Sequence, residues 1–541
     1  MPRHVPDHFF GHPRPLSTLF HIELWERFSY YGMQSILLIY LYYEVTRGGL
    51  GIDQGLAGGI VGIYGGSVYL ATILGGWLAD RVLGAERTLF YSGIVVMLGH
   101  IALAMVPGVP GLVLGLVCIA LGSGGVKSSA SSMVGALYED PQWHALRDAG
   151  FSIFYLAVNI GGFFGPLLTG VLQTEMGFHY GFGAAALGMA FGLWRYARGR
   201  AGLPQLPVPN PLSPAQRVRV QLAAVAVIAV VGALFGARVI HPGNFSSVVL
   251  GINIVAVLGY FGRMLLGPGF SASEKRHVLA YVPLFLAACV FWMLWFQVFT
   301  SVVVYFDETV VRRIGDWEAP VSWSASAQSL WVIILAGTMA TLWTKLGDKQ
   351  PRTPMKFVLS LFVLAAGYYC FVPYIKAGEP MSMLVFVGVL FLITVAELLI
   401  SPIAISLATK IAPASFRTQM VAVNFLSLSL GFTAGGVLFD AHYSKEAAAD
   451  FYIELTVISL VCAVALLVLV PVLVFCASYK ISSTFRGRIE QARQEMGVTF
   501  VYDVDKAAFQ AATAPMIQTY EDKYPGVKRL MQSIEQVREA N

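Results

Sequence analysis

Long apolar stretches separated by short polar segments run along almost the whole chain. About 14 of them reach the roughly 20 residues that a helix needs to cross the hydrocarbon core of a bilayer. Their predicted bounds are 17–43, 54–80, 88–106, 110–136, 148–173, 179–198, 217–239, 246–266, 277–305, 325–346, 355–375, 381–409, 417–439 and 453–479. The pattern predicts an all-α integral membrane protein with about 14 transmembrane helices.

The overall composition agrees with a membrane location. Of the 541 residues, 56% are hydrophobic and 12% are charged, whereas a soluble domain carries about 25% charged residues. Such a chain has too few charges to cover a water-facing surface, so the apolar excess must face lipid. The net charge of +5 does not indicate a nucleic-acid partner, because no basic run is interleaved with aromatic residues.

The basic residues indicate how the chain is oriented in the membrane. Most Lys and Arg residues lie at one end of the predicted spans. The loops at the other end hold only Arg47, Arg238, Arg312, Arg313, Lys376 and Lys445. Because basic loops stay on the cytoplasmic side, we predict a multi-pass protein of the cell inner (plasma) membrane with both termini in the cytoplasm. The polar N-terminal segment is not expected to be a cleavable signal peptide.

A Pro-rich segment near the middle of the chain divides the spans into groups. The stretch AGLPQLPVPNPLSP is expected to be extended rather than helical. We predict a cytoplasmic N-terminus (1–16), an N-terminal six-helix bundle (17–200), the Pro-rich linker (201–215), two inserted helices (216–270), a C-terminal six-helix bundle (271–480) and a cytoplasmic C-terminal tail (481–541). The two inserted helices carry almost no ionisable residue, so we expect them to be peripheral and exposed to lipid.

The first span carries polar residues along one face. At helical spacing, five residues fall within an arc of roughly 100°. They are Glu23, Glu26, Arg27, Tyr30 and Gln34. Charged residues inside a membrane span are costly and usually functional, and one Glu must stay ionised to balance Arg27. The other Glu is then free to bind a proton, although a purely structural ion pair near a membrane interface is the alternative interpretation.

Two further charges lie deep in predicted spans. Lys127 follows the run Gly122 to Gly125 of span 4, and Glu397 stands among apolar residues in span 10. A lone carboxylate in a span needs a cationic partner, so we hypothesise a Lys127–Glu397 ion pair that joins the two bundles as a gate. The alternative for Lys127 is a side chain that extends to the membrane surface from near a helix end.

The sequence predicts neither an enzyme nor a metal site. The five cysteines lie within or at the ends of apolar segments, and histidines such as His100 and His277 are scattered. No H-E-x-x-H motif, no G-x-S-x-G motif in a useful setting and no pair of intramembrane aspartates is present. We therefore expect no cofactor and no metal.

At this point the sequence resembles a known family. The segment ELWERFSYYG (Glu23 to Gly32) is similar to the ExxERFxYYG motif of the proton-dependent oligopeptide transporter (POT or PTR) family. Three more segments resemble family motifs in the same order: GGWLADRVLGAERT (75–88), FSIFYLAVNIGGFFGP (151–166) and AELLISP (396–402). The resemblance implies the major-facilitator fold, with two six-helix bundles and the two extra helices of bacterial members.

The resemblance also implies a function and a set of site residues. It implies alternating-access symport of di- and tripeptides with protons, driven by the proton gradient, by a monomer in the lipid bilayer. Glu23, Glu26 and Arg27 would handle protons and the substrate carboxylate, with Arg27 among the peptide-binding residues, and Lys127 would also face the peptide carboxylate. Glu397 and Asn159 would receive the peptide amine. The cavity would be lined by Tyr30, Tyr31, Tyr69 and Tyr155, with Trp292 and Ser401 on the opposite side.

Three positions depart from the family pattern, and we include them among the expected peptide-binding residues. Gln34 replaces an Arg of the first motif, Trp331 stands where members commonly have Asn, and Asn424 stands where they commonly have Trp. We hypothesise that the last two changes are a reciprocal swap across a shared wall of the cavity.

Other functions remain open at this stage. A transporter of the same fold could carry a different small solute, such as nitrate or an amino-acid derivative. Glu397 argues against an anion, because it would be an uncompensated negative charge in an anion site. A passive channel or a substrate sensor is also conceivable, but buried pairs of opposite charge favour alternating access.

Overall fold

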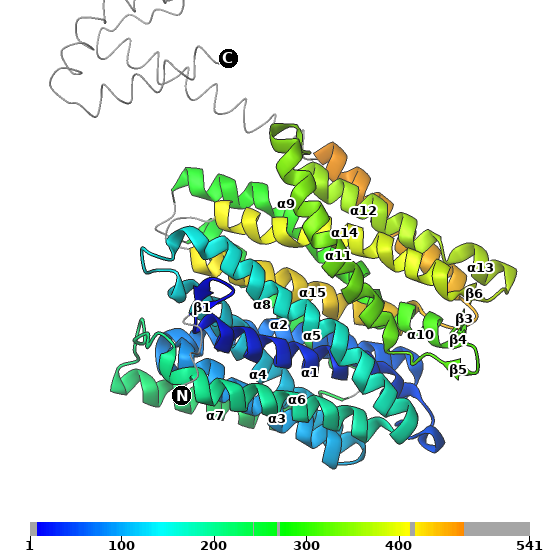
Figure 1. The fold of residues 1–541 in the computed structure, drawn as a ribbon, viewed down its shortest axis with the longest axis horizontal. Coiled ribbons are helices and arrows are strands. Elements are labelled where there is room, and N and C mark those ends of the chain that lie inside the picture. The colour runs from blue at the N-terminus through cyan, green and yellow to red at the C-terminus, as the bar shows by residue number, and fades with distance from the viewer. Residues whose placement is uncertain (1–7, 242, 268–270, 412–416, 470–541) are drawn as a thin grey trace, which may run out of the picture. The chain divides into compact units, whose positions relative to one another are not determined.

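The computed structural model describes residues 8–241, 243–267, 271–411 and 417–469, and nearly all of them are helical. The first group of helices is α1 (Leu16–Tyr42), α2 (Gln54–Leu78), α3 (Ala85–Met105), α4 (Gly108–Leu137), α5 (Arg147–Met176) and α6 (Phe178–Gly199). They pack against one another in the N-terminal half of the chain, with α3 against α4 and α1 against both α5 and α6 (Figure 1).

The second group begins with α7 (Pro214–Gly236) and α8 (Phe245–Leu266). It continues with α9 (Ala272–Trp295), α10 (Ser301–Glu308), α11 (Trp323–Leu346), α12 (Thr353–Tyr369), α13 (Val372–Ala377), α14 (Met383–Ile411) and α15 (Arg417–His442). One more helix covers Ala448–Leu469, where the described residues end. The part of the predicted last span beyond 469 and the predicted tail lie outside the described residues.

The strands are short and lie near the helix ends. Strand β1 (His8–Phe9) pairs antiparallel with β2 (His12–Pro13), and β4 (Arg313–Ile314) pairs antiparallel with β5 (Trp317–Glu318). Strand β3 (Val310–Val311) pairs in parallel with β6 (Met381–Ser382). These pairs fasten loops at the helix ends, and Val310 of β3 and Met381 of β6 are buried in the hydrophobic core.

Twelve helices among the described residues are long and apolar enough to cross a membrane. Helices α1 and α6 have similar length but fall outside that set, and they carry polar residues such as Glu23 and His179. The predicted span over 277–305 is confirmed as one membrane-crossing segment, Glu274–Glu308, but this segment is not a single regular α-helix. The chain bends between α9 and α10, where Thr300 has φ −128° and ψ −97° and donates to Oε1 of Gln297 over 2.7 Å. Gln297 in turn donates to the carbonyl of Gly435 over 3.0 Å, so the bend is held by contact with α15.

The two halves meet along two pairs of helices, α2 with α15 and α5 with α11. In the first pair the backbones approach closely at glycines. A Cβ placed on Gly62 would lie only 2.5 Å from the Cα of Gly436. In the second pair Ser322 and Ser326 of the C-terminal half donate to carbonyls of Pro166 and Phe163 over 2.8 and 2.9 Å. All these contacts lie toward the end of the bundle where α1 ends and α2 begins. The halves are in contact there, and we call it the closed end.

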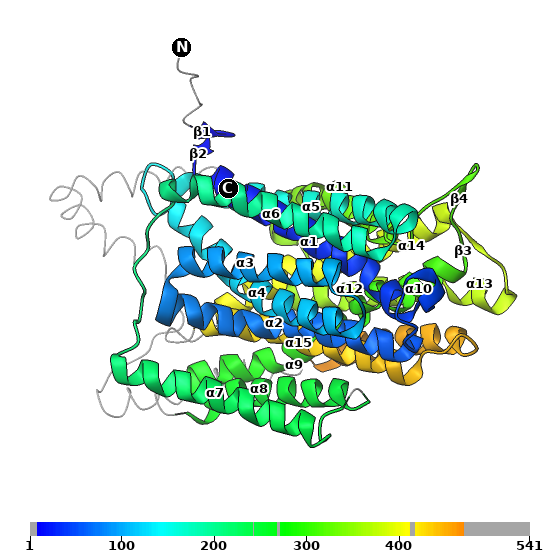
Figure 2. The ribbon, with the colours of Figure 1, turned by 90° about the horizontal axis from the view of Figure 1, so that it is seen from below.

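Helix α8 contacts α2, α9 and α15 and so touches both halves. Its Asn253 is fully buried and accepts a 2.5 Å hydrogen bond from Ser429 of α15, which also donates to the carbonyl of Gly66 in α2 over 2.7 Å. Helix α7 lies beside α8 (Figure 2) and presents an apolar surface without buried residues. In a bilayer this exposure fits a helix that faces lipid.

The α2–α15 contact predicts a difference between two glycines of α2. Adding a methyl group at Gly62 (Gly62→Ala) forces two backbones apart and should destabilise the protein by about 1–3 kcal/mol, the usual cost of overpacking. The matched change Gly76→Ala should be neutral or slightly stabilising, because its Cβ would meet only Cβ of Ser128 at 3.9 Å. Thermal unfolding of both variants in detergent measures the difference. Equal melting temperatures for Gly62→Ala and the unmodified protein would contradict the close approach.

Candidate functional site

The charged stripe of α1 is assembled as the sequence predicts. Nε of Arg27 lies 2.7 Å from Oε1 of Glu23 and 3.4 Å from Oε2 of Glu26. The other carboxylate oxygen of Glu26, Oε1, accepts a hydrogen bond of 3.0 Å from Ser123 of α4. Glu23 is 2% exposed and Glu26 is fully buried. Two carboxylates therefore share one guanidinium inside the N-terminal half.

Lys127 of α4 lies close to Tyr30 of α1, in the same half of the protein as the charged stripe. We call this side of the site the N-terminal wall. Nζ of Lys127 is 4.7 Å from the centre of the Tyr30 ring and 5.9 Å from that of Tyr69, distances at which an ammonium is attracted by the electrons of an aromatic ring. It has no hydrogen-bond partner in the described part of the chain. With Arg27 and the two glutamates, Lys127 makes the cluster electrically neutral when both carboxylates are ionised. Its ammonium group keeps all its donors available.

Glu397 of α14 is the acidic group contributed by the opposite half. Its Oε2 accepts hydrogen bonds from Nε1 of Trp295 over 3.1 Å and from Nε2 of Gln328 over 3.3 Å. Both donors are uncharged, so they orient the carboxylate without neutralising it. Sequence reasoning missed both residues, because nothing in an apolar span indicates which of its few polar side chains will face a carboxylate on another helix.

The hypothesised Lys127–Glu397 ion pair is absent from this conformation. No salt bridge joins the two residues in the described structure, where Lys127 lies over Tyr30 and Glu397 is held by Trp295 and Gln328. The reason is geometric: the halves contact each other along α2–α15 and α5–α11 near the closed end. No comparable contact brings α4 against α14 in the described residues.

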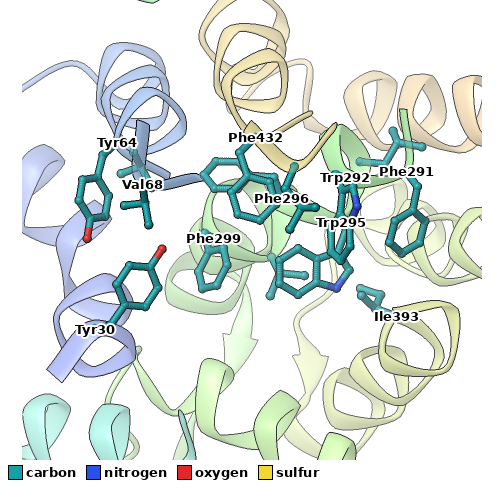
Figure 3. Close-up of a cluster of buried hydrophobic side chains, with 14 of the residues drawn as sticks. Tyr30, Tyr64, Val68, Phe291, Trp292, Trp295, Phe296, Phe299, Ile393 and Phe432 are labelled. Carbon is teal, nitrogen blue, oxygen red and sulfur yellow. The ribbon is translucent and has the colours of Figure 1, made fainter. Parts of the chain in front are cut away.

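Aromatic side chains of α1, α2, α9 and α15 form a buried cluster between the halves (Figure 3). The rings of Tyr30 and Tyr64 stack with centres 6.3 Å apart, and Tyr31 packs edge-on against Tyr30. Figure 3 shows the two tyrosines on one side and Trp292 and Trp295 on the other, with phenylalanine rings between them. The two indoles lie 5.4 Å apart, and Nε1 of Trp292 is buried without a hydrogen-bond partner in the described residues.

The remaining predicted lining residues have varied surroundings. Tyr69 packs against Phe425 and Phe432 of α15, which places it at the interface of the halves. Tyr155 is 45% exposed, and Asn159 donates to the Tyr155 carbonyl over 3.0 Å within α5. Ser401 is half-buried on α14, one helical turn after Glu397.

The three departures from the family pattern are found in different environments. Gln34 is 3% exposed and Asn424 is 2% exposed, and each has a side-chain carbonyl without a partner in the described part of the chain. Trp331 donates to the Val387 carbonyl over 3.0 Å and packs against Phe391 of α14. Among the described residues no hydrogen bond or ring contact joins Trp331 to Asn424, and their reciprocal swap stays a hypothesis.

Known proteins support the resemblance seen in the sequence. Residues 86–453 match the family described as PTR2, the POT family. The uncharacterized transporter YclF of Bacillus subtilis (strain 168) is 42% identical over 426 residues, which are 77% of this chain and 86% of the relative. A di-/tripeptide transporter of Lactococcus lactis subsp. cremoris is 39% identical over 439 residues, 77% of this chain and 87% of the relative.

A solved structure gives the same result for the fold. The crystal structure of a peptide transporter POT in complex with sulfate superimposes with a TM-score of 0.82 at 38% sequence identity. The match covers 86% of this chain and 96% of the other, which confirms the predicted fold class. This chain therefore belongs to the POT family of membrane transporters.

Proposed function

We propose that this protein carries di- and tripeptides together with protons across the cell inner membrane. The observation that carries the proposal is the separation of charge between the halves. Arg27 and Lys127 lie on the N-terminal wall, and Glu397 lies on the C-terminal wall. A short peptide is a zwitterion with a carboxylate at one end and an ammonium group at the other. The two walls match its two ends, and similarity to transporters named for di- and tripeptides supports this cargo.

The hydrogen bonding of each wall favours this assignment. Lys127 has an ammonium group without a hydrogen-bond partner in the described residues, which suits a ligand carboxylate. Glu397 is oriented by two neutral donors to a single oxygen, which leaves its charge available to a ligand ammonium group. A buried charge without an opposite charge is costly, and a bound zwitterion would neutralise both walls at once.

Proton coupling in this scheme begins at the α1 cluster. Because Glu23 and Glu26 share Arg27, protonation of one carboxylate would weaken its hold on the guanidinium. Arg27 would then be available to the carboxylate of the peptide. Loss of the proton on the other side of the membrane would restore the Glu–Arg pairing and release the peptide. We assign the proton to Glu26, since Glu26 is fully buried and borders both Arg27 and Ser123.

Alternating access requires that the closed end open and the other end close. The contacts between halves at the closed end include backbone approaches and hydrogen bonds to carbonyls. Tyr42 and Tyr43 of α1 also donate hydrogen bonds to the carboxylate of Asp307 in the C-terminal half, and all of these contacts would have to break when that end opens. In the opposite conformation, approach of α4 and α14 would bring Lys127 and Glu397 together as the predicted gate. We place both termini in the cytoplasm, in keeping with the distribution of basic residues, and we propose the monomer as the functional unit.

A non-peptide solute carried by the same fold is the second candidate. Gln34 and Asn424 each present an unpaired buried carbonyl among the described residues, and neither matches the usual family residue. These groups could select an amino-acid derivative that has both an ammonium and a carboxylate group. Such a ligand would use the same two charged walls.

Uptake into proteoliposomes tests the cargo. We expect labelled dialanine to accumulate only with an inward proton gradient, and unlabelled di- and tripeptides to compete with it. Single amino acids and nitrate serve as controls and should not compete. Competition by an amino-acid derivative without competition by peptides would replace the peptide assignment and keep the transport scheme.

The assignment of the proton predicts the behaviour of Glu26→Gln. This variant should lose proton-driven accumulation of peptide by at least about tenfold, because the coupling proton has no binding site, while exchange of labelled for unlabelled peptide continues. Glu86→Gln is the matched control, since Glu86 is also buried but pairs with Arg200 away from the cavity. Loss of exchange as well as accumulation in a folded Glu26→Gln protein would assign Glu26 to peptide binding instead.

The closed end provides a test of alternating access. A Cβ on Gly59 of α2 would lie 3.4 Å from the Cβ of Asp440 of α15, close to the separation found in disulfides. The double variant Gly59→Cys, Asp440→Cys should form a disulfide on oxidation, lose transport and regain it on reduction. Each single variant should keep transport under oxidation. Full transport by a completely cross-linked protein would show that α2 and α15 need not separate.

A further inference from the structure

One helix of the inserted pair carries a buried amide that the transport scheme leaves unused. Asn253 of α8 is fully buried. Its Nδ2 donates to the Val249 carbonyl over 3.1 Å and to Oγ1 of Thr433 on α15 over 3.4 Å, and its Oδ1 accepts from Ser429 on α15 over 2.5 Å. An apolar side chain of similar size would fill the same space without needing polar partners. The amide therefore calls for an explanation in the contact between α8 and α15.

Helix α8 is fastened to the C-terminal half. Besides the bonds of Asn253 to α15, Phe261 of α8 packs edge-on against Phe285 of α9, with ring centres 5.0 Å apart. Toward α2 the contact is of another kind. Oγ of Ser246 would lie 3.3 Å from a Cβ placed on Gly59, and no hydrogen bond joins α8 to α2 in the part of the chain that the structure describes. From its place on the outer side of the bundle (Figure 2), α8 should therefore move with α9 and α15 and slide past α2.

The hydroxyl of Ser429 faces both halves at once. Its Oγ lies 2.7 Å from the Gly66 carbonyl of α2 in the N-terminal half and 2.5 Å from Oδ1 of Asn253. A hydroxyl group has one hydrogen to donate, so the two acceptors compete for it. The Gly66 carbonyl lies inside α2, where a helical carbonyl also accepts from the N–H four residues later. It can therefore lose Ser429 without being left unpaired.

Opening of the closed end changes which acceptor Ser429 can reach. When α2 moves away from α15, the Gly66 carbonyl leaves with it, whereas Asn253 stays beside Ser429. The single hydrogen of the hydroxyl then passes entirely to Asn253, so the number of hydrogen bonds is unchanged. Without Asn253, the fully buried hydroxyl of Ser429 would lose this bond on opening. A buried donor without an acceptor raises the free energy of the open state.

We propose that Asn253 is a positioning residue of the transport cycle, which holds the hydroxyl of Ser429 when α2 and α15 separate and so eases opening of the closed end. This role gives the inserted helix α8 a function in alternating access. It acts through Ser429 and requires no contact with the cargo or with the proton-coupling residues of α1. The inference rests on the proposed alternating-access transport and adds a residue outside the two six-helix bundles.

The test measures how often the closed end opens. Ser326 of α11 is 2% exposed and bonds to the Phe163 carbonyl across the halves. A cysteine there (Ser326→Cys), in a protein whose five native cysteines are replaced by alanine, should react with a water-soluble maleimide only during opening. The rate of this reaction therefore reports the open population. Loss of the acceptor in Asn253→Leu should slow the reaction about tenfold, the effect of roughly one hydrogen bond.

Matched variants separate this role from a structural one. Asn253→Asp keeps an oxygen acceptor and should not slow the reaction. Asn244→Leu is the control, because Asn244 stands at the start of α8 and bonds to the Val239 carbonyl and the His241 N–H in its own loop, and its rate should stay unchanged. In a Ser429→Ala protein, where the shared hydrogen is absent, Asn253→Leu should cause no further slowing.

An unchanged rate in a folded Asn253→Leu protein would overturn the proposal, as would equal slowing with and without the hydroxyl of Ser429. If Asn253→Leu does not fold, Asn253→Ala, which also lacks the acceptor, decides in the same way. The proposed function fails differently. No reaction of Ser326→Cys while Asn253 is intact would reject alternating access and this inference with it. Failure of peptide uptake alone would reject the cargo and leave the maleimide test valid.

Discussion

The interior of this protein depends on one constraint: charges placed inside a membrane span must be balanced there. The α1 cluster meets it by sharing Arg27 between Glu23 and Glu26, with Ser123 completing the coordination of Glu26. Lys127 supplies the fourth charge, next to aromatic rings. The balance holds only while both carboxylates are ionised. Protonation of either carboxylate would leave one positive charge of the cluster uncompensated, which is the physical basis of the proposed coupling between proton binding and substrate binding.

The C-terminal half holds its buried charge in a different way from the α1 cluster. Glu397 faces neutral donors, Trp295 and Gln328, and lacks a cation in the described structure. Its charge is oriented but not compensated, which makes that wall ready for a positively charged group from a ligand. The two walls are thus complementary to a zwitterion and to each other.

The interface between the halves is built so that it can open. At α2–α15 the contact relies on glycines such as Gly62 and Gly436, where backbones touch directly. At α5–α11 serine hydroxyls bond to carbonyls. Neither surface would expose a buried charge on separation. Helix α8 adds Asn253 to the α2–α15 contact, so one inserted helix takes part in the closed end while α7 faces outward.

The sequence by itself determined the elements and the kind of chemistry. Apolar stretches of sufficient length gave the helices, and the spacing of Glu23, Glu26 and Arg27 gave their common face, because both properties repeat locally along a helix. Only the tertiary structure decided which polar groups meet across helices: Gln328 with Glu397, Ser123 with Glu26, and the separation of Lys127 from Glu397 in this conformation. Such contacts join residues far apart in the chain, and they depend on how the helices pack and which end of the bundle is closed, which no local periodicity encodes.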